Sequence, residues 1–225
     1  MSKLVHCVVI SLSLFLGVFS TAAAQTATSS DSAHEVVKQA TENVMSVVRD
    51  APEYVDEDPE RYYAQVESIL DPVIDFRGFA RGVMGPYASS ERYRSLDEAG
   101  REKLREQLDR FTKVMRAGLV RTYSKGLLAF GGSKIELSDE VDESPDARRT
   151  TVTQLIFSEN AQPYVVMYQM GLDKQRSWKL RNVIIESVNL GEIFRNQFEA
   201  SARKYDGDLD QVIDNWTTAE LETTG

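Results

Sequence analysis

The sequence predicts an α+β fold in which N-terminal helices pack on a four-stranded antiparallel sheet. Apolar residues recur with helical spacing from residue 32 to residue 130. From residue 133 to residue 189 the spacing falls to about two, which is typical of strands with one buried face. Short polar segments join these strands, and short connections favour an antiparallel meander.

Four helices are predicted before residue 131. The stretches Ser32–Glu35 and Ser95–Glu98 match a capping box, in which a serine and a glutamate three positions later satisfy the first free N–H groups. Asp58-Pro59 begins another helix, because proline is favoured in the first helical turn. The segment DFRGFARGVMGPY, residues 75–87, predicts the remaining helix, which Gly85-Pro86 ends.

The helix predicted in residues 75–87 has a crowded apolar face and several glycines. Its apolar side chains fall on one face, and Arg77 and Arg81 point away from it. Gly78 and Gly82 allow another element to approach this helix closely. The segment is therefore expected to bury its phenylalanines against a partner element.

The second half of the chain predicts the sheet and two closing helices. A helix starts at Gly191, and a short one covers residues 209–216. Helices first and strands second is the order of an α+β layer packing. The strands are expected near residues 133–141, 149–158, 163–172 and 177–189.

The N-terminus has the features of a secretory signal peptide over residues 1–24. Lys3 supplies the positive start, residues 8–19 form an apolar run, and Ala22-Ala23-Ala24 is a small-residue cleavage site. The apolar run is short for a bilayer-spanning helix, and no second run follows it. We expect cleavage after Ala24 and export to the periplasm.

The remaining chain is expected to form one domain over residues 25–216, followed by an acidic, disordered tail over residues 217–225. Cys7 is the only cysteine and leaves with the signal, so burial alone must stabilise the mature protein, which suits the periplasm. The signal contains Lys3 and no acidic residue, so its removal takes the formal charge from −9 to −10. This acidity argues against nucleic acid as a partner.

The mature sequence offers little catalytic chemistry. His34 is its only histidine, and the sequence contains no nucleophile motif, phosphate loop or His/Cys metal cluster. The stretch DGDLD at 206–210 resembles the start of a calcium loop, but Gln211 stands where such a loop needs glycine and Thr217 where it needs glutamate. Asp75 is expected to cap a helix or form an ion pair, and Glu186 to face outward from its strand. The sequence therefore predicts no enzyme, no cofactor and no metal site.

Three stretches resemble the MlaC-like periplasmic phospholipid carriers, also called toluene-tolerance proteins. DFRGFARGVMGPY at 75–87 is similar to their Asp-Phe-x-x-(Met/Phe)-Ala-Arg element, and GLVRTYSKGLLAF at 118–130 to their Leu-Val-Arg-Thr-Tyr helix end. WKLRNVIIESVNLGEIFRNQF at 178–198 resembles their last strand and the helix after it. The sequence departs from the family pattern at Asn182, Ser187 and Asn189.

The resemblance implies that helices and a twisted four-stranded sheet enclose an apolar pocket for phospholipid tails. Helical and strand periodicity alone would favour a filled core at the same positions, and it leaves open which strand faces line a pocket. The candidate lipid-binding residues are Phe76, Phe79, Val83, Met84, Phe111, Met115, Leu119, Tyr123, Val152, Gln154, Ile156, Tyr164, Val166, Tyr168, Met170, Trp178, Leu180, Val183 and Ile185.

Arg81, Arg121 and Arg195 recur in the matched motifs and are candidates for binding the phosphate headgroup, with structural ion pairs as the alternative. The resemblance further implies two docking partners, an inner-membrane ABC transporter with an MCE-type subunit and an outer-membrane lipoprotein complex. Two other functions stay open. One is an isomerase- or hydrolase-like enzyme with an apolar substrate in a similar cone-shaped pocket, and the other is an interaction module with a filled core.

Overall fold

The computed structural model describes residues 32–128, 133–138, 147–157 and 162–217. The predicted signal peptide lies outside this range, and of the predicted tail only Thr217 is described. The elements in chain order are α1 (Ala33–Asp50), η1 (Ala51–Glu53), α2 (Pro59–Leu70), α3 (Phe76–Met84), η2 (Gly85–Ala88), α4 (Ser90–Ser95), α5 (Glu98–Leu128), β1 (Lys134–Leu137), β2 (Arg149–Phe157), β3 (Tyr164–Leu172), β4 (Trp178–Ile185), β5 (Val188–Asn189), α6 (Leu190–Lys204) and α7 (Leu209–Asp214).

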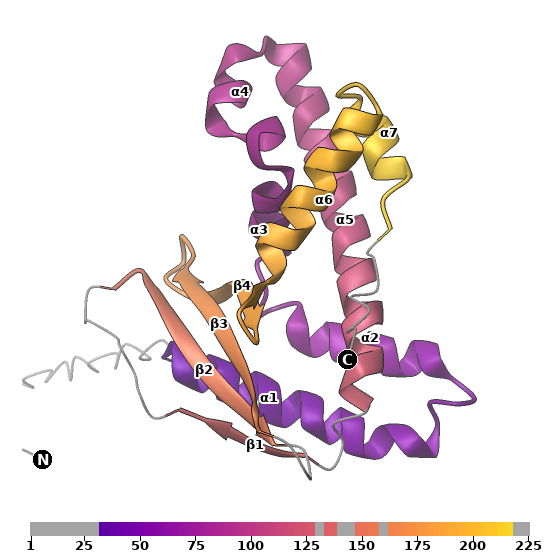
Figure 1. Cartoon of the computed structure of the whole chain (residues 1–225), viewed down its shortest axis with the longest axis vertical. Helices are drawn as coiled ribbons and strands as arrows, with labels where there is room; N and C mark the ends of the chain where they lie inside the picture. Colours follow the sequence, from indigo (N-terminus) through magenta and orange to yellow (C-terminus); the bar gives the residue numbers. More distant parts are fainter. Residues whose placement is uncertain (1–31, 129–132, 139–146, 158–161, 218–225) are drawn as a thin grey trace, which may run out of the picture.

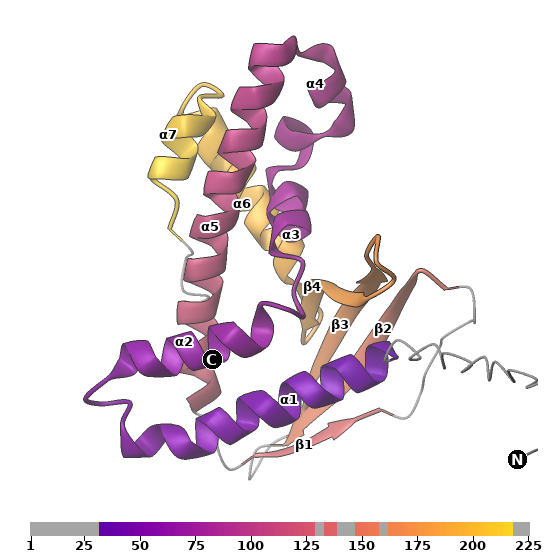
Figure 2. The same ribbon diagram turned by 180° about the vertical axis from the view of Figure 1, so that it is seen from behind.

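These elements form two regions joined by the long helix α5 (Figure 1). The first, which we call the sheet end, contains α1, α2, the sheet and the C-terminal turns of α5 (Figure 1). The second, which we call the helical end, contains α3, α4, α6, α7 and the rest of α5 (Figure 1). In the view from behind, α1 crosses one face of the sheet (Figure 2). The predicted α+β class is confirmed.

The sheet is an antiparallel meander in the order β1-β2-β3-β4-β5. The prediction of a single last strand over residues 177–189 is wrong, because the chain turns at Glu186 and Ser187 and pairs back as β5. These two residues have φ of +49° and +70°, and a tight hairpin turn requires such angles at both central positions. Neither residue is glycine, so the usual sequence signal of such a turn is absent here.

Two of the three helix caps predicted from the sequence are confirmed. The Ser32 hydroxyl accepts a hydrogen bond from the Glu35 N–H at 3.1 Å, and the Asp58 carboxylate accepts one from the Arg61 N–H at 3.1 Å. The third prediction is wrong by two residues, because Asp97 rather than Ser95 accepts from the N–H of Gly100.

Ser95 fails as that cap because it belongs to the preceding helix. It is the last residue of α4, and its hydroxyl donates to the Arg92 carbonyl at 2.8 Å. Apolar periodicity did not predict α4, since a helix of six residues is too short to show it. The long helix therefore begins at Glu98.

The helical end has a core built around stacked aromatic rings, which we call the aromatic core. The ring of Phe111 lies 5.0 Å from those of Phe198 and Trp216, and Phe198 lies 5.8 Å from Trp216. Its buried members are Ala80, Val83, Met84, Ala88, Leu104, Leu108, Phe111, Met115, Leu190, Phe194, Phe198, Ala202, Leu209, Val212, Ile213 and Trp216.

The sheet end has two smaller buried clusters, which follow each other along α1. One joins α1 to α2 through Val44, Val48, Tyr62 and Val66, and the other joins α1 to the sheet through Val37 and Met170 among others. Within the described residues, no helix is both long and apolar enough to cross a membrane.

Candidate functional site

An apolar pocket of about 150 Å³ lies between α1 and the sheet. The end of α2, the turn after it and the end of α5 also contribute to its lining, through Leu70, Val73 and Leu127. The lining residues are Val37, Ala40, Thr41, Val44, Met45, Leu70, Val73, Leu127, Ile135, Gln154, Ile156, Tyr168, Met170 and Leu180. None of them carries a formal charge.

Helical spacing explains the contribution of α1. Val44 and Met45 lie three and four positions after Thr41, which lies four after Val37, so the four side chains form one stripe along the helix. Their neighbours Lys38 and Glu42 are exposed on the opposite side. One face of α1 therefore serves as a wall of the pocket.

Register explains the contribution of the sheet. Residues paired across neighbouring strands point to the same face, and Val152 pairs with Tyr168, Gln154 with Val166 and Met170 with Leu180. All the sheet candidates from the sequence therefore share one face, which is the face that α1 covers.

A bulge in β4 is needed for this arrangement. Gln169 pairs with Asn182 and Met170 with Leu180, so Arg181 is the extra residue on its strand. Without it, Leu180 and Val183 would point to opposite faces, since strand side chains alternate. The bulge puts both on the pocket side.

Only some of the predicted residues on this face reach the pocket. Ile156, Tyr168, Met170 and Leu180 line it, as does Gln154. Val183 and Ile185 pack instead against the aromatic core, while Val152 and Trp178 pack near the start of α1. Val166 is buried and Tyr164 is 42% exposed, and neither lines the pocket.

The predicted residues from the helices lie elsewhere. Phe76 is buried, and its ring lies 5.8 Å from the guanidinium carbon of Arg116. The lining residues from α1 and α2 were not among the candidates predicted from the sequence. The helical spacing of apolar residues in α1 was a signal that could have indicated them. The remaining helical candidates belong to the aromatic core or pack against it: Phe79, Val83, Met84, Phe111, Met115, Leu119 and Tyr123.

A chain of three polar side chains crosses the pocket wall. The Tyr168 hydroxyl donates to Gln154 Oε1 at 2.8 Å, and Gln154 Nε2 donates to Thr41 Oγ1 at 2.9 Å. Gln154 is 2% exposed, so its amide depends on these partners. Burial raises the pKa of the Tyr168 hydroxyl above its usual range, which keeps it a donor. This chain ties α1 to β2 and β3.

The three candidate headgroup arginines all lie outside the pocket lining. Arg121 forms an ion pair with Glu60 at 2.8 Å. Arg81 donates to the Ser90 hydroxyl at 3.0 Å, and Arg195 donates to the backbone carbonyl of Gly82 at 3.0 Å.

The two carboxylates considered for catalysis have structural contacts. Asp75 accepts a hydrogen bond from the Gly78 N–H at 2.8 Å and forms an ion pair with Arg181. This accounts for Gly78, because a Cβ there would lie 2.1 Å from the Asp75 carboxylate. Glu186 accepts from the backbone N–H of Val165. In the described parts of the chain, no three His, Cys, Asp or Glu side chains are grouped to hold a metal ion.

A family model described as "MlaC protein" matches residues 38–218. The chain belongs to the MlaC family. The match covers every lining residue of the pocket except Val37.

Two relatives extend this comparison. The chain is 28% identical over 183 residues to the toluene tolerance protein Ttg2D of Pseudomonas putida, which covers 81% of this chain and 79% of that protein. A solved structure of a phospholipid-binding protein from Ralstonia solanacearum, in complex with a phospholipid, superposes with a TM-score of 0.67. That likeness covers 82% of this chain and 94% of the other at 18% identity, so it shows a shared fold.

Proposed function

We propose that this protein is a periplasmic phospholipid carrier, which holds acyl chains between α1 and the sheet. The observation that carries the proposal is the uncharged pocket, which is lined almost wholly by aliphatic and thioether side chains. Membership of the MlaC family and the shared fold with a phospholipid-binding protein support it. The pocket side chains present no charged group that could act as acid or base, so binding without chemistry fits them best.

The energetic need for such a carrier follows from the size of the ligand. Two acyl tails contain on the order of 30 methylenes, and exposing each to water costs about 0.8 kcal/mol. A free phospholipid would therefore cross an aqueous compartment against a barrier on the order of 20 kcal/mol. An apolar pocket in a water-compatible protein removes most of that barrier.

The pocket must open before it can hold a tail. A cavity of about 150 Å³ accepts a group the size of benzene, whereas most ligand sites enclose about 300 to 1,000 Å³. We infer that α1 moves away from the sheet as lipid enters, since it supplies one wall. Among the described residues, Thr41–Gln154 is the only hydrogen bond between side chains of α1 and the sheet.

The proposal includes the transport route. The carrier would exchange lipid between an inner-membrane ABC transporter with an MCE-type subunit and an outer-membrane lipoprotein complex. Passive exchange needs neither nucleotide nor cofactor on the carrier itself. Cleavage after Ala24 would release the mature chain into the periplasm.

The first test is to express the chain with its own export signal, purify it from the periplasm, and combine native mass spectrometry with lipid extraction. Phospholipid at one or more molecules per chain is expected. Ala40→Phe projects a ring into the pocket from α1 and should remove the lipid without unfolding the protein. Ala64→Phe makes the same change on the exposed side of α2 and should keep the lipid.

Two results would contradict the carrier. One is a folded wild-type protein with no bound lipid after mild purification. The other is equal lipid content in the Ala40→Phe and Ala64→Phe proteins, which would place the tails outside this pocket.

A further inference from the structure

A second groove of about 550 Å³ lies between α3, α4, the first half of α5 and the turn from β3 to β4. It shares no lining residue with the apolar pocket. The lining residues are Asp75, Arg77, Gly78, Arg81, Ala88, Ser89, Ser90, Tyr93, Arg94, Leu104, Arg105, Leu108 and Lys174. Five of them are cationic and one is a carboxylate, in a chain whose formal charge is −9.

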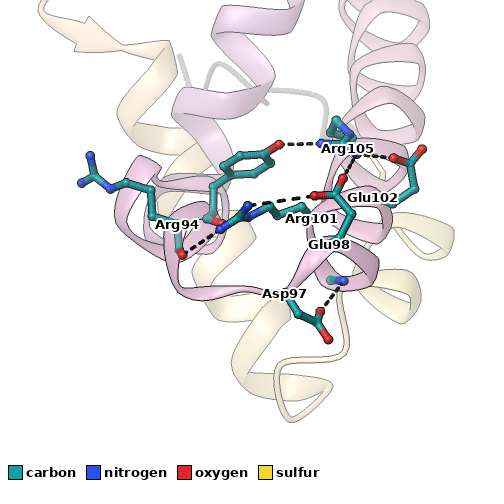
Figure 3. A network of polar contacts seen from close by, with 8 residues as sticks. Arg94, Asp97, Glu98, Arg101, Glu102 and Arg105 are labelled. Carbon is teal, nitrogen blue, oxygen red and sulfur yellow. Dashed lines mark hydrogen bonds and ion pairs between the residues drawn. The ribbon is translucent and has the colours of Figure 1, made fainter.

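Two of the five cations are already paired with acids. Arg77 forms an ion pair with Asp109. Arg105 contacts both Glu98 and Glu102, which belong to the same helix (Figure 3). These pairs partly neutralise the α5 side of the groove.

The other three cations have no acidic partner among the described residues. In Figure 3 the Arg94 guanidinium points away from the network, and only its backbone carbonyl is used, as the acceptor from Arg101. Arg81 donates to the neutral hydroxyl of Ser90, and Lys174 is exposed on the turn after β3. Arg81, Arg94 and Lys174 all line the groove, so their charges act on the same space.

The floor of the groove is apolar. Ala88, Leu104 and Leu108 lie beneath it and are 6 to 8% exposed, and the half-buried Tyr93 forms part of its side. Guanidinium groups bind carboxylates through paired hydrogen bonds, and an apolar floor adds contact for a side chain between those carboxylates. An inorganic anion would use the rim alone, and a bilayer surface is too broad to enter the groove.

We propose that this groove binds an acidic segment of a partner protein, in which Asp or Glu residues flank an apolar side chain. The segment would place its carboxylates against Arg81, Arg94 and Lys174. The net negative charge of the whole chain opposes adsorption to anionic bilayers, which favours a local, peptide-sized contact. This site goes beyond the lipid pocket and does not depend on it.

The test measures fluorescence anisotropy of a labelled peptide of Glu-Glu-Leu repeats with the mature protein at low salt. Replacing Arg81, Arg94 and Lys174 by Gln should weaken binding by about tenfold or more, with the loss shrinking as salt screens the charges. The control replaces Lys113, Lys125 and Arg149 by Gln, which are exposed, unpaired among the described residues and outside the groove. This control should bind within about twofold of wild type.

Three outcomes would overturn the proposal. Wild type that does not bind the peptide is the first, and an equal loss in both triple variants is the second, because it would show only an effect of net charge. The third is a groove variant that keeps peptide binding but loses binding to phosphatidylglycerol vesicles, which would make the groove a membrane contact. Lipid content of the groove variant should stay at the wild-type level, and this readout separates the groove from the carrier function.

Discussion

The helical end and the sheet end bury apolar surface in different ways. In the aromatic core, Phe111, Phe198 and Trp216 contact one another edge to face or at a tilt, and all three are at most 8% exposed. At the sheet end, the apolar faces of α1 and the sheet leave a pocket between them. The first arrangement gives dispersion contacts on every side, whereas side chains around a pocket lack contacts on one side. The helical end is therefore a filled core, whereas the sheet end contains a cavity whose walls can move more easily.

The largest expected effect separates the two regions directly. Phe198→Ala removes a ring from the packed core and should lower the free energy of unfolding by about 3 to 5 kcal/mol. Met170→Ala removes a side chain that borders the pocket and should cost about 2 kcal/mol, at the low end for such changes. Urea denaturation of both variants measures this difference, and equal losses would contradict the contrast between the regions.

The next largest effect on stability is expected where α3 of the helical end meets β4 of the sheet, through the ion pair between Asp75 and Arg181. Gly78→Ala should cost about 2 kcal/mol, because a Cβ would displace the Asp75 carboxylate from both its helix cap and its ion pair with Arg181. Gly82→Ala is the matched control in the same helix, since nothing lies within 4 Å of the added Cβ. It should be neutral or stabilise by up to about 1 kcal/mol. Thermal unfolding of both variants measures these changes. A larger loss of stability in Gly82→Ala than in Gly78→Ala would contradict the role given to Asp75.

A smaller effect, which depends on pH, is expected in the helical end. Burial alone would raise the pKa of Asp210, but hydrogen bonds from Lys103, Gln107 and Arg110 lower it below its usual value. A lowered pKa in the folded state adds stability above the unfolded-state pKa of about 4. That stability is lost as the pH falls through the folded-state pKa.

Asp210→Asn tests this contribution. The variant should be about 1 kcal/mol less stable than wild type at pH 7, because part of the site is exposed to solvent. The difference should shrink as the pH falls from about 4 through the lower folded-state pKa of Asp210, where the wild-type carboxyl also becomes neutral. Urea denaturation at several pH values measures it, and a difference independent of pH would mean that the charge contributes nothing.

An effect on stability no larger than that of Asp210→Asn is expected for the hydrogen bond between Thr41 and Gln154. Thr41→Val keeps the shape of the side chain but removes the acceptor for Gln154 Nε2, and it should cost about 1 kcal/mol. Hydrogen exchange should increase in α1 and stay unchanged in α6 of the helical end. Thr112→Val is the control, because its hydroxyl bonds only within its own helix, to the Leu108 carbonyl. Faster exchange in both variants, or in neither, would contradict α1 as the movable wall.

The sequence predicted most helices and strands because caps and side-chain alternation act between residues close together in the chain. Ser32 and Asp58 cap helices at the predicted positions, and the alternating candidates of β2 and β3 share one face of the sheet. The predicted cap Ser95 is instead the last residue of the short helix α4. Asp97 caps α5 in its place, one residue before that helix begins. A capping motif of four residues cannot show that one of them belongs to the preceding helix.

The tertiary structure decided where the pocket lies. Helical periodicity marks an apolar face but does not show which surface covers that face. Phe111 and Met115 therefore lie in the aromatic core, whereas Val44 lines the pocket. The bulge at Arg181 aligned β4 with its neighbours, and strand alternation alone could not show it. Which apolar faces meet in a filled core, and which leave a space, depends on the relative positions of elements far apart in the chain.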